Sequence, residues 1–463
     1  MKPVSATLKH TPYMRYFSVI LLAFGLLGTA PLQAQTFSLQ ECQDMAVANN
    51  RSLANTRTDM AMAAEDEAMA FTKFFPSVSA GATGFIAAKD LIRTEMDLSD
   101  LAAAYGPALG QMGMAIPESY AVSMMKKGAV ADVMATQPLY AGGQIRTGRK
   151  LAALQHEVRR LQVNMEERDL LQHVAEYYWQ ICALRANAAT VDTVLAQLRG
   201  VHRYTENYVK AGITHRNALL QIEMKQQEME SSRLQLDNAD ALLRMVLAQL
   251  CGMKPQGFDV RPEATRPEDC PAPETLFIAP GDAVENRVEL ALAERNVRAQ
   301  QLQERMERGK LLPSVAIGAA GMYQDMELGG GMDNMKNGNL IGFATVSIPI
   351  TDWWGGKHTL RKARLQRQKA ENSREEAREQ LEIDILSAWN NLTEGYAQIE
   401  VAQRSITSAD ENLRLTTDEY RAGTIDITDM LDAVTLYTQA HNRMTEAVAN
   451  YQTRMADYLQ KTR

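Results

Sequence analysis

The feature that most constrains this chain is an internal sequence repeat. Residues 46–78 align with residues 283–315 at a constant offset and without a gap, and such self-similarity identifies repeat architectures. Pro76 and Pro313, each followed by Ser-Val, coincide in this alignment. Two copies of one pattern predict two structurally equivalent halves rather than one globular core.

Later landmarks extend the repeat. Residues 138–143 match residues 349–356, and Lys210-Ala-Gly matches Arg421-Ala-Gly. Each half is predicted to run helix, proline, strand, loop, strand, Gly-Gly, long helix, glycine turn and helix.

The halves are separated by a proline-rich segment. Residues 252–280 hold six prolines, which exclude a continuous helix. We therefore expect a first repeat over 35–251, a linker over 252–280 and a second repeat over 281–463.

The long helices carry the clearest periodicity. Large residues recur every seven positions from Ile385 to Tyr420, with small residues three positions later, a coiled-coil pattern. No proline interrupts residues 143–212 or 356–423, so at ~1.5 Å per residue each helix would be roughly 100 Å long. These helices are predicted to pair with returning helices over 214–250 and 425–459, and to find partners beyond a single compact core.

Four segments have the length of tilted barrel strands, which need ~9 to 11 residues. They cover residues 77–86, 129–140, 314–323 and 340–350. Four strands cannot close a barrel alone, so we expect oligomerisation to close it and to remove the open edges that a membrane forbids.

The amino-terminal residues predict export. Lys2, Lys9 and Arg15 precede an apolar run, and cleavage is expected after Ala34, as in a signal peptide over 1–34. Met14 is an alternative start. After this segment no apolar run is long enough for a transmembrane helix.

Composition excludes several functions. A net charge of -7 argues against nucleic acid as a partner. No phosphate loop, nucleophile motif or His pair at helical spacing occurs, so neither an enzyme nor a cofactor or metal site is expected. Pairing of Cys251 with Cys270 stays open. The 25 methionines crowd the two strand-connecting loops and suit either adaptable packing or soft-metal contacts.

The segment from Tyr420 to Tyr437, taken with the repeat, resembles the TolC family of outer membrane efflux proteins. The resemblance implies a mainly α fold with a small β part, in which a homotrimer forms an α-barrel and a shared twelve-stranded transmembrane β-barrel. It further implies a passive outer-membrane exit duct of a tripartite efflux or type I secretion system. Its partners would be a periplasmic adapter protein, an inner-membrane transporter of the RND or ABC type, and outer-membrane lipid.

The resemblance also assigns roles to residues at the second glycine turn. Asp429 and Asp432 match aspartates that line the periplasmic aperture, and Tyr420 matches a tyrosine that helps to close it. An arginine expected shortly afterwards is replaced by Ile425, and Asn217 stands near an expected aspartate, so a charged latch is in doubt. An aspartate one turn into a helix also offsets the helix dipole, which is the plainer interpretation.

The two glycine turns would be the tips that the adapter meets. The residues concerned are Lys210, Gly212, Arg421 and Gly423. A different class of function, a soluble periplasmic coiled-coil adapter or scaffold without a pore, is disfavoured by the four strand-length segments. The cargo, whether drugs, metals or protein, depends on the transporter served.

Overall fold

The computed structural model describes residues 35–89, 91–262, 267–328 and 335–463. The predicted signal peptide, and Met332 with the neighbouring loop glycines, lie outside the described residues. The described chain forms two compact units. Unit 1 contains the residues up to Asn55 together with Asn164–Arg287 and Glu382–Arg463, and unit 2 contains Thr56–Val163 and Val288–Leu381.

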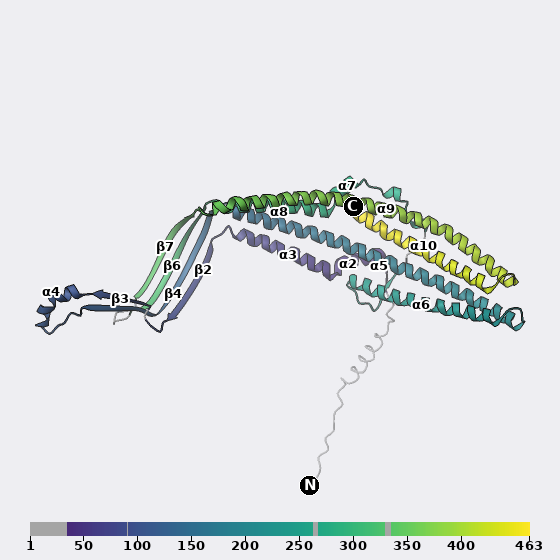
Figure 1. The fold of residues 1–463 in the computed structure, drawn as a ribbon, viewed down its shortest axis with the longest axis horizontal. Coiled ribbons are helices and arrows are strands. Elements are labelled where there is room, and N and C mark those ends of the chain that lie inside the picture. Colours follow the sequence, from purple (N-terminus) through teal and green to yellow (C-terminus); the bar gives the residue numbers. More distant parts are fainter. Residues whose placement is uncertain (1–34, 90, 263–266, 329–334) are drawn as a thin grey trace, which may run out of the picture. The chain divides into compact units, whose positions relative to one another are not determined.

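Unit 2 holds an antiparallel sheet in the order β2-β4-β6-β7 (Figure 1). A short strand, β3, pairs with the first part of β4, and a helix, α4, lies between them in the sequence. The bounds are β2 (Ser77–Ile86), β3 (Ile92–Asp97), α4 (Ser99–Gly110), β4 (Ser119–Ala141), β6 (Ser314–Leu328) and β7 (Met335–Ser347).

The four expected strands are therefore present, with different ends. β2 has the predicted bounds, but β4 begins at Ser119 rather than at residue 129, and β7 ends at Ser347 rather than at residue 350. The extension of β4 has a physical reason, since its first residues pair with β3. The β3 strand and α4 were not foreseen.

The pairing register sorts the strand residues onto two different faces. Direct partners share a face, so Ala80, Val133, Gly321 and Leu340 form one row on one face of the sheet. The neighbouring row on the other face contains Gly81, Asp132, Met322 and Asn339. We call the first the apolar face; it carries Val78, Ala80, Ala82, Ala131, Val133, Ala135, Val315, Ile317, Ala319, Tyr323, Leu340, Ala344 and Val346, with Gln137 as a polar residue opposite Ile317. We call the second the polar face; it carries Ser77, Ser79, Thr83, Asp132, Thr136, Gln324, Asn337, Asn339 and Thr345, interspersed with the apolar residues Phe85, Val130, Met134, Met322, Ile341 and Phe343.

A close backbone approach joins the strand ends of unit 2 to its helices. Gly142 has a φ of 60°, and a Cβ atom there would lie 2.1 Å from the carbonyl oxygen of Gly309. Only glycine has neither the side chain nor the backbone restriction that would prevent this contact.

The helices of the chain alternate with these strands. The elements that precede the sheet are α3 (Arg51–Thr72) and α8 (Val288–Lys310), and those that follow it are α5 (Gln144–Lys210) and α9 (Asp352–Ala422). The returning helices are α6 (Arg216–Leu250) and α10 (Ile427–Thr462). These bounds confirm the predicted long helices, although α9 begins before the second Gly-Gly pair rather than after it.

Unit 1 is completed by short elements around the ends of α6 and α10. Ser38 caps the first helix through a reciprocal bond with Glu41, as in a capping box. The elements are β1 (Gln35–Phe37), α2 (Leu39–Asn49), β5 (Phe258–Val260), two 3-10 turns (Pro267–Asp269 and Pro273–Leu276) and α7 (Pro280–Glu285). The β1 and β5 strands pair in parallel.

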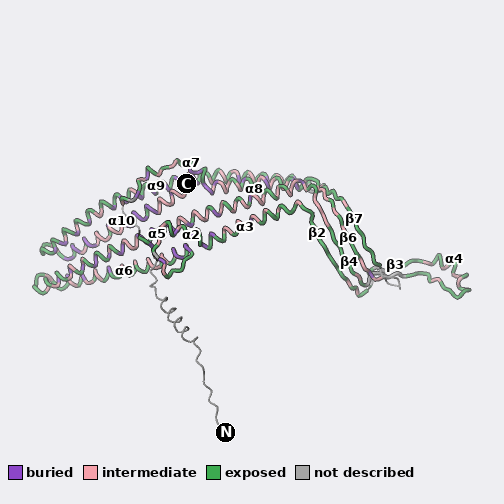
Figure 2. The backbone as a smooth tube through the Cα atoms, turned by 180° about the vertical axis from the view of Figure 1, so that it is seen from behind, coloured by how far each residue is buried: buried purple, intermediate pink, exposed green. Residues whose placement is uncertain are grey.

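The heptad positions form the core of unit 1. Five of the six large residues of the α9 series are buried, and so are Ala388, Ala402 and Ala409 on the adjacent seam. Figure 2 shows buried positions recurring along α9. The small side chains allow the helices to approach closely. The coiled-coil prediction is confirmed, as is the mainly helical fold class with a small β part.

The four cysteines are buried thiols. The Cys251 thiol donates to the carbonyl oxygen of Cys42 at 3.4 Å, whereas Cys270 accepts from Gln452 at 3.7 Å. The Cys251–Cys270 pair, left open by the sequence, is not formed. Separately, none of the helices in the described part of the chain is both long enough and apolar enough to cross a membrane.

Candidate functional site

Two helical hairpins end in the same backbone motif. Gly212 has a φ of 73° and Gly423 a φ of 75°, the left-handed region that glycine adopts without strain. The amide of Ile213 bonds to Tyr208 and that of Gly212 to Val209, which is the Schellman pattern. The amides of Thr424 and Gly423 make the equivalent bonds to residues 419 and 420.

A basic residue lies in the last helical turn before each glycine. Lys210 Nζ lies 2.7 Å from Glu206, and this hydrogen bond lowers the pKa of the Glu206 carboxyl group. Arg421 lies 3.5 Å from Asp418, and its guanidinium is 5.2 Å from the centre of the Tyr204 ring. Lys210 and Arg421 are both exposed. The tips therefore present positive charge where the C-terminal end of a helix favours it.

Tyr420 joins the two hairpins. Its hydroxyl lies 2.7 Å from Thr205 Oγ1, and both side chains are buried. Burial raises the pKa of Tyr420, while the hydrogen bond from Thr205 acts in the opposite direction. A second bond runs from the Tyr208 hydroxyl to the carbonyl oxygen of Arg421 at 2.7 Å. Within one chain, the two tips are thus linked by uncharged hydrogen bonds.

Below these bonds, an apolar cluster packs the four helices together. It contains residues from α5, α6, α9 and α10, including Leu198, Ile222, Leu413 and Met430. Ile425, at the position where the family resemblance expects an arginine, packs against this cluster. Asn217, at the position of an expected acid, is exposed.

Asp429 and Asp432 lie on the exposed side of α10 near its start. The residues between and beside them, Met430, Ala433 and Val434, are buried in the cluster. The two carboxylates are one turn apart and share a face, as the spacing predicts. Their exposure within a single chain leaves them available to line a passage.

A small groove between the two tips was missed by the sequence analysis. It has a volume of about 290 Å³ and is lined by residues of both hairpins, among them Tyr208, Asn217, Tyr420 and Asp426. No sequence signal announces it, because it forms only when the two hairpins lie side by side.

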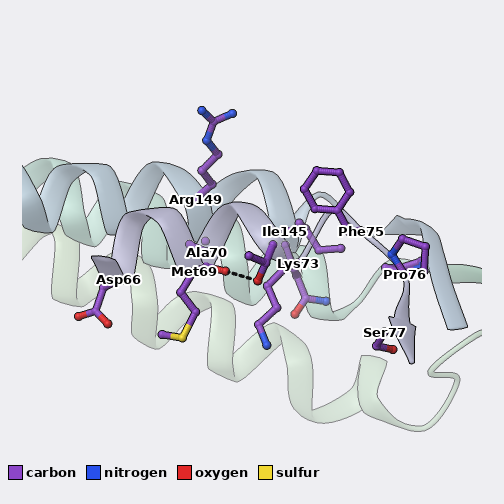
Figure 3. A pocket seen from close by; sticks show the side chains of 13 residues that line it. Asp66, Met69, Ala70, Lys73, Phe75, Pro76, Ser77, Ile145 and Arg149 are labelled. Atoms are coloured by element: carbon purple, nitrogen blue, oxygen red, sulfur yellow. Dashed lines mark hydrogen bonds between the residues drawn. The ribbon is translucent and has the colours of Figure 1, made fainter. Parts of the chain in front are cut away.

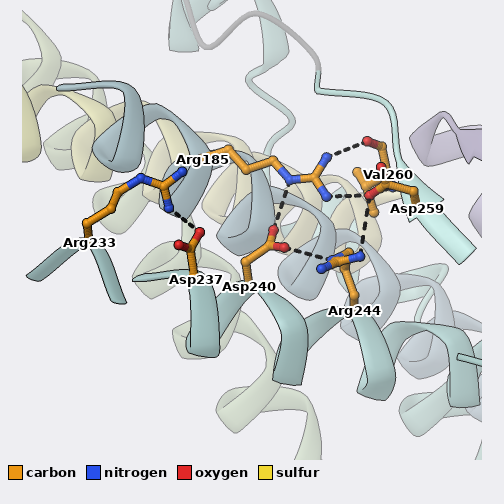
Figure 4. A network of polar contacts seen from close by, with 7 residues as sticks. All are labelled: Arg185, Arg233, Asp237, Asp240, Arg244, Asp259 and Val260. Carbon is orange, nitrogen blue, oxygen red and sulfur yellow. Dashed lines mark hydrogen bonds and ion pairs between the residues drawn. The ribbon is translucent and has the colours of Figure 1, made fainter. Parts of the chain in front are cut away.

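Unit 1 also contains a polar network (Figure 4). Arg185 on α5 bonds to Asp240 on α6 at 2.8 Å, to Asp259 on β5, and to the carbonyl oxygen of Val260 at 2.7 Å. Burial by itself raises the pKa of Asp259, but the hydrogen bonds from Arg185 and from the Val260 amide outweigh it and lower the pKa. The network fastens the segment after α6 to the helical hairpin.

A pocket of about 820 Å³ lies in unit 2 between the end of α3 and the start of α5. Met69, Phe75 and Ile145 supply apolar lining, and Lys73 and Arg149 supply the basic groups. Figure 3 shows these two cations pointing in opposite directions, so they do not converge on one ligand. Arg149 instead lies over the Phe71 ring, 4.9 Å from its centre.

The described residues offer no metal centre: among them, no group of three His, Cys, Asp or Glu side chains is placed to hold an ion. The tips present exposed charged side chains of both signs, with Lys210 and Arg421 beside the turns and Asp429 and Asp432 on α10.

Comparison with known proteins agrees with this geometry. Residues 279–457 match the sequence profile of the outer membrane efflux protein family. No curated protein sequence matches the chain.

Solved structures with the same fold cover almost the whole chain. A Pseudomonas aeruginosa membrane protein matches with a TM-score of 0.72 at 16% identity, covering 92% of this chain and 90% of that one. The outer membrane protein VceC of Vibrio cholerae matches with a TM-score of 0.70 at 15% identity, over 92% and 95% of the two chains. The open state of the MtrE outer membrane channel of Neisseria gonorrhoeae matches with a TM-score of 0.67 at 17% identity, over 92% and 88%. Residues 279–457 are therefore similar in sequence to the outer membrane efflux protein family, and the described chain has the fold of these outer membrane channel structures, as the sequence resemblance implied.

Proposed function

We propose that this protein is the outer-membrane exit duct of a tripartite efflux or type I secretion system. Three copies each contribute β2, β4, β6 and β7 to one transmembrane barrel and their long helices to a tunnel through the periplasm. The duct is passive and catalyses no reaction. An inner-membrane transporter of the RND or ABC type drives the cargo, and a periplasmic adapter couples the two.

The observation that carries the proposal is the unlike character of the two sheet faces. On β6 the apolar face extends from Val315 to Tyr323, about 27 Å at ~3.4 Å per residue, on the order of the ~25 Å apolar band of an outer-membrane barrel. Beyond Tyr323 the same face carries Asp325 and Lys336, which pair at 3.5 Å. The polar face suits a water-filled lumen.

The sheet also has two open edges, one on β2 and one on β7. Unpaired backbone groups are not tolerated in lipid, so a sheet that spans a membrane must close. Pairing β7 of one copy with β2 of the next closes a ring and satisfies both edges.

The alternative, a soluble scaffold without a pore, is not favoured by this sheet. It would leave the apolar face in water, where Leu340 is 77% and Val346 63% exposed in the single chain. A contiguous exposed apolar surface of this kind marks a site that contacts lipid or protein.

The proposal is tested by size and conductance. The mature protein, extracted from outer membranes in neutral detergent, should have the mass of three copies and form channels in planar bilayers. Recovery as a monomer from the soluble periplasm, with no conductance, would support the scaffold instead.

The aspartate pair provides a second prediction. Three copies would place Asp429 and Asp432 as a ring of carboxylates at the periplasmic aperture, which would favour cations. Replacing both by Asn should lower the cation-to-anion permeability ratio measured from reversal potentials. An unchanged ratio in a channel of normal conductance would remove the ring.

The adapter is proposed to meet the tips at Gly212 and Gly423, where Lys210 and Arg421 are exposed. Replacing the two basic residues by Gln should weaken cross-linking to the adapter and leave the trimer intact. Loss of the trimer itself would show that these side chains act in folding rather than in docking.

A further inference from the structure

The exposed side of α9 and α10 in the single chain carries a second groove, to which the proposed function assigns no role. It has a volume of about 630 Å³ and lies wholly within unit 1. Val401, Ala409, Leu436 and Ala440 form its apolar part. Its polar part consists of Arg404, Ser405, Ser408, Asn412, Gln439 and Arg443.

The charged residues that line this groove are all basic. Its lining in the described chain holds two arginines and no acid. Arg404 and Arg443 are exposed, and neither forms an ion pair or side-chain hydrogen bond with any residue that the structure describes. Three acids lie near these arginines in sequence, and none of them is part of the lining. Asp410 is held by His441 at 2.9 Å, Glu400 precedes Arg404 by four residues, and Glu446 follows Arg443 by three.

Most other arginines of the neighbouring helix turns are neutralised. Arg414, on the same helix, bonds to Glu411 at 2.7 Å and to Asp418 at 3.4 Å. Two guanidinium groups beside one apolar surface, without a counterion, are complementary to an anion that has an apolar body.

The position of the groove follows from the spacing along α10. Asp429, Asp432, Leu436, Gln439 and Arg443 recur at intervals of three and four, so they share one face of the helix. If the aspartates line the aperture, Leu436 and Arg443 line the passage behind it. Arg443 lies about 16 Å beyond Asp432 at ~1.5 Å per residue.

We propose that the α9/α10 groove is a cargo-binding site inside the duct that takes amphipathic organic anions, such as aromatic carboxylates or sulfonates. The anionic group bonds to Arg404 and Arg443, and the apolar body lies on Val401 and Leu436. This inference rests on the proposed function, because the groove faces cargo only if the Asp429 face of α10 lines the passage.

Binding is tested on the purified full chain in neutral detergent by equilibrium dialysis with naphthalene-1-sulfonate, against a detergent blank. The wild type should bind the probe, and Arg404→Gln with Arg443→Gln should weaken binding about tenfold or more, since two charge-assisted hydrogen bonds are lost. Arg414→Gln is the matched control, because that guanidinium is already paired, and it should bind as the wild type does. Arg404→Lys with Arg443→Lys keeps both positive charges and should retain part of the affinity.

The location is tested separately in planar bilayers. Naphthalene-1-sulfonate added on the side of the helical tips should block the wild-type current, and the double variant should lose the block. A naphthyl trimethylammonium cation, which has the same apolar body, should not distinguish the two proteins.

Three results would overturn the inference. The first is no binding by the wild type, which is expected if acidic residues of a second copy fill the groove. The second is equal binding by the wild type and the double variant, and the third is binding without current block, which would place the groove outside the passage. A protein that forms no channel at all would contradict the proposed function, whereas the dialysis result would still report on the groove.

Discussion

At the scale of single residues, the contact between Tyr420 and Thr205 decides how firmly the two hairpin tips are joined. The pair is buried and lies 215 positions apart in the sequence. Tyr420→Phe removes the hydroxyl and leaves Thr205 without this partner, so the free energy of unfolding should fall by about 1 kcal/mol. Urea unfolding measures this effect, and channel recordings should show a larger mean conductance because the tips separate more readily.

A double-mutant cycle provides the control for this pair. Thr205→Val should have a similar effect, and the double variant should be little worse than either single change, because the same bond is removed. Fully additive losses would mean that the two hydroxyl groups act independently and that the bond does not hold the tips.

The Arg185 network predicts a dependence of stability on pH. Because the pKa of Asp259 is lowered in the folded state, its contribution is fully present above its unfolded pKa near 3.8 and is lost as the pH falls through the lower folded value. Asp259→Asn should reduce stability at pH 7 by on the order of 1–3 kcal/mol, since it leaves Arg185 partly uncompensated.

The loss caused by Asp259→Asn should shrink as the pH falls below about 4, because the carboxyl group of the wild type is protonated first in the unfolded chain and only at a lower pH in the folded protein. Asp192→Asn is the matched control. Asp192 pairs with Arg233 at 3.0 Å but its side chain is 56% exposed, so this change should cost less than about 1 kcal/mol. Equal losses at the two positions would contradict the assigned role of the network.

The sequence predicts which residues are exposed or buried better than it predicts which residues contact each other. The exposed pair Asp429 and Asp432 follows from helical spacing, and so does the buried position of Tyr420 on its heptad. The partner of Tyr420 could not be predicted, because Thr205 becomes its neighbour only through packing of two separate hairpins. The same holds for the groove at Arg404 and Arg443, whose side chains lie on different helices.

At the scale of elements, the long helices were predictable because their heptad periodicity and the glycines that end them are both visible in short stretches of sequence. The heptads and the absence of proline placed α5 within two residues of its observed ends, and the glycines marked both turns. The strands were harder to delimit. The first part of β4 contains Met124 and Lys127 and has no alternating pattern, so its pairing with β3 left no sequence signal.

The glycine turns give a prediction about the hairpins. Gly423→Ala forces an L side chain into a φ of 75° and should destabilise the hairpin by roughly 1 kcal/mol. Gly200→Ala is the opposite case, because this glycine is inside α5 and an added Cβ would meet nothing within 4 Å. That change should stabilise by roughly 0.5–1 kcal/mol. Thermal unfolding of both variants measures the difference, and a shift of the same sign at both positions would contradict the assignment of the turn.

At the scale of the whole molecule, the sheet rather than the helices determines where the protein resides. The apolar face was obscured in the sequence because glycine and alanine occupy many positions on both faces. A bulge between Pro138 and Tyr140 also shifts the alternation, so that Tyr140 pairs with Val315 on the apolar face. The two faces could therefore be distinguished only from the cross-strand register in the structure.

The two faces are tested by introducing one charge at adjacent positions of β4. Val133 lies on the apolar face and Met134 on the polar face, and they are 52% and 43% exposed in the single chain. If the apolar face meets lipid, Val133→Lys places an ammonium group in the bilayer and should cost about 2–4 kcal/mol. Met134→Lys points into water in the lumen and should be tolerated. The amount of trimer assembled in outer membranes, followed by urea unfolding in lipid vesicles, compares the two. Since both variants introduce lysine into the same strand at adjacent, well-exposed positions, an equal loss of trimer would show that the faces do not separate lipid from water, and the outer-membrane barrel would have to be abandoned.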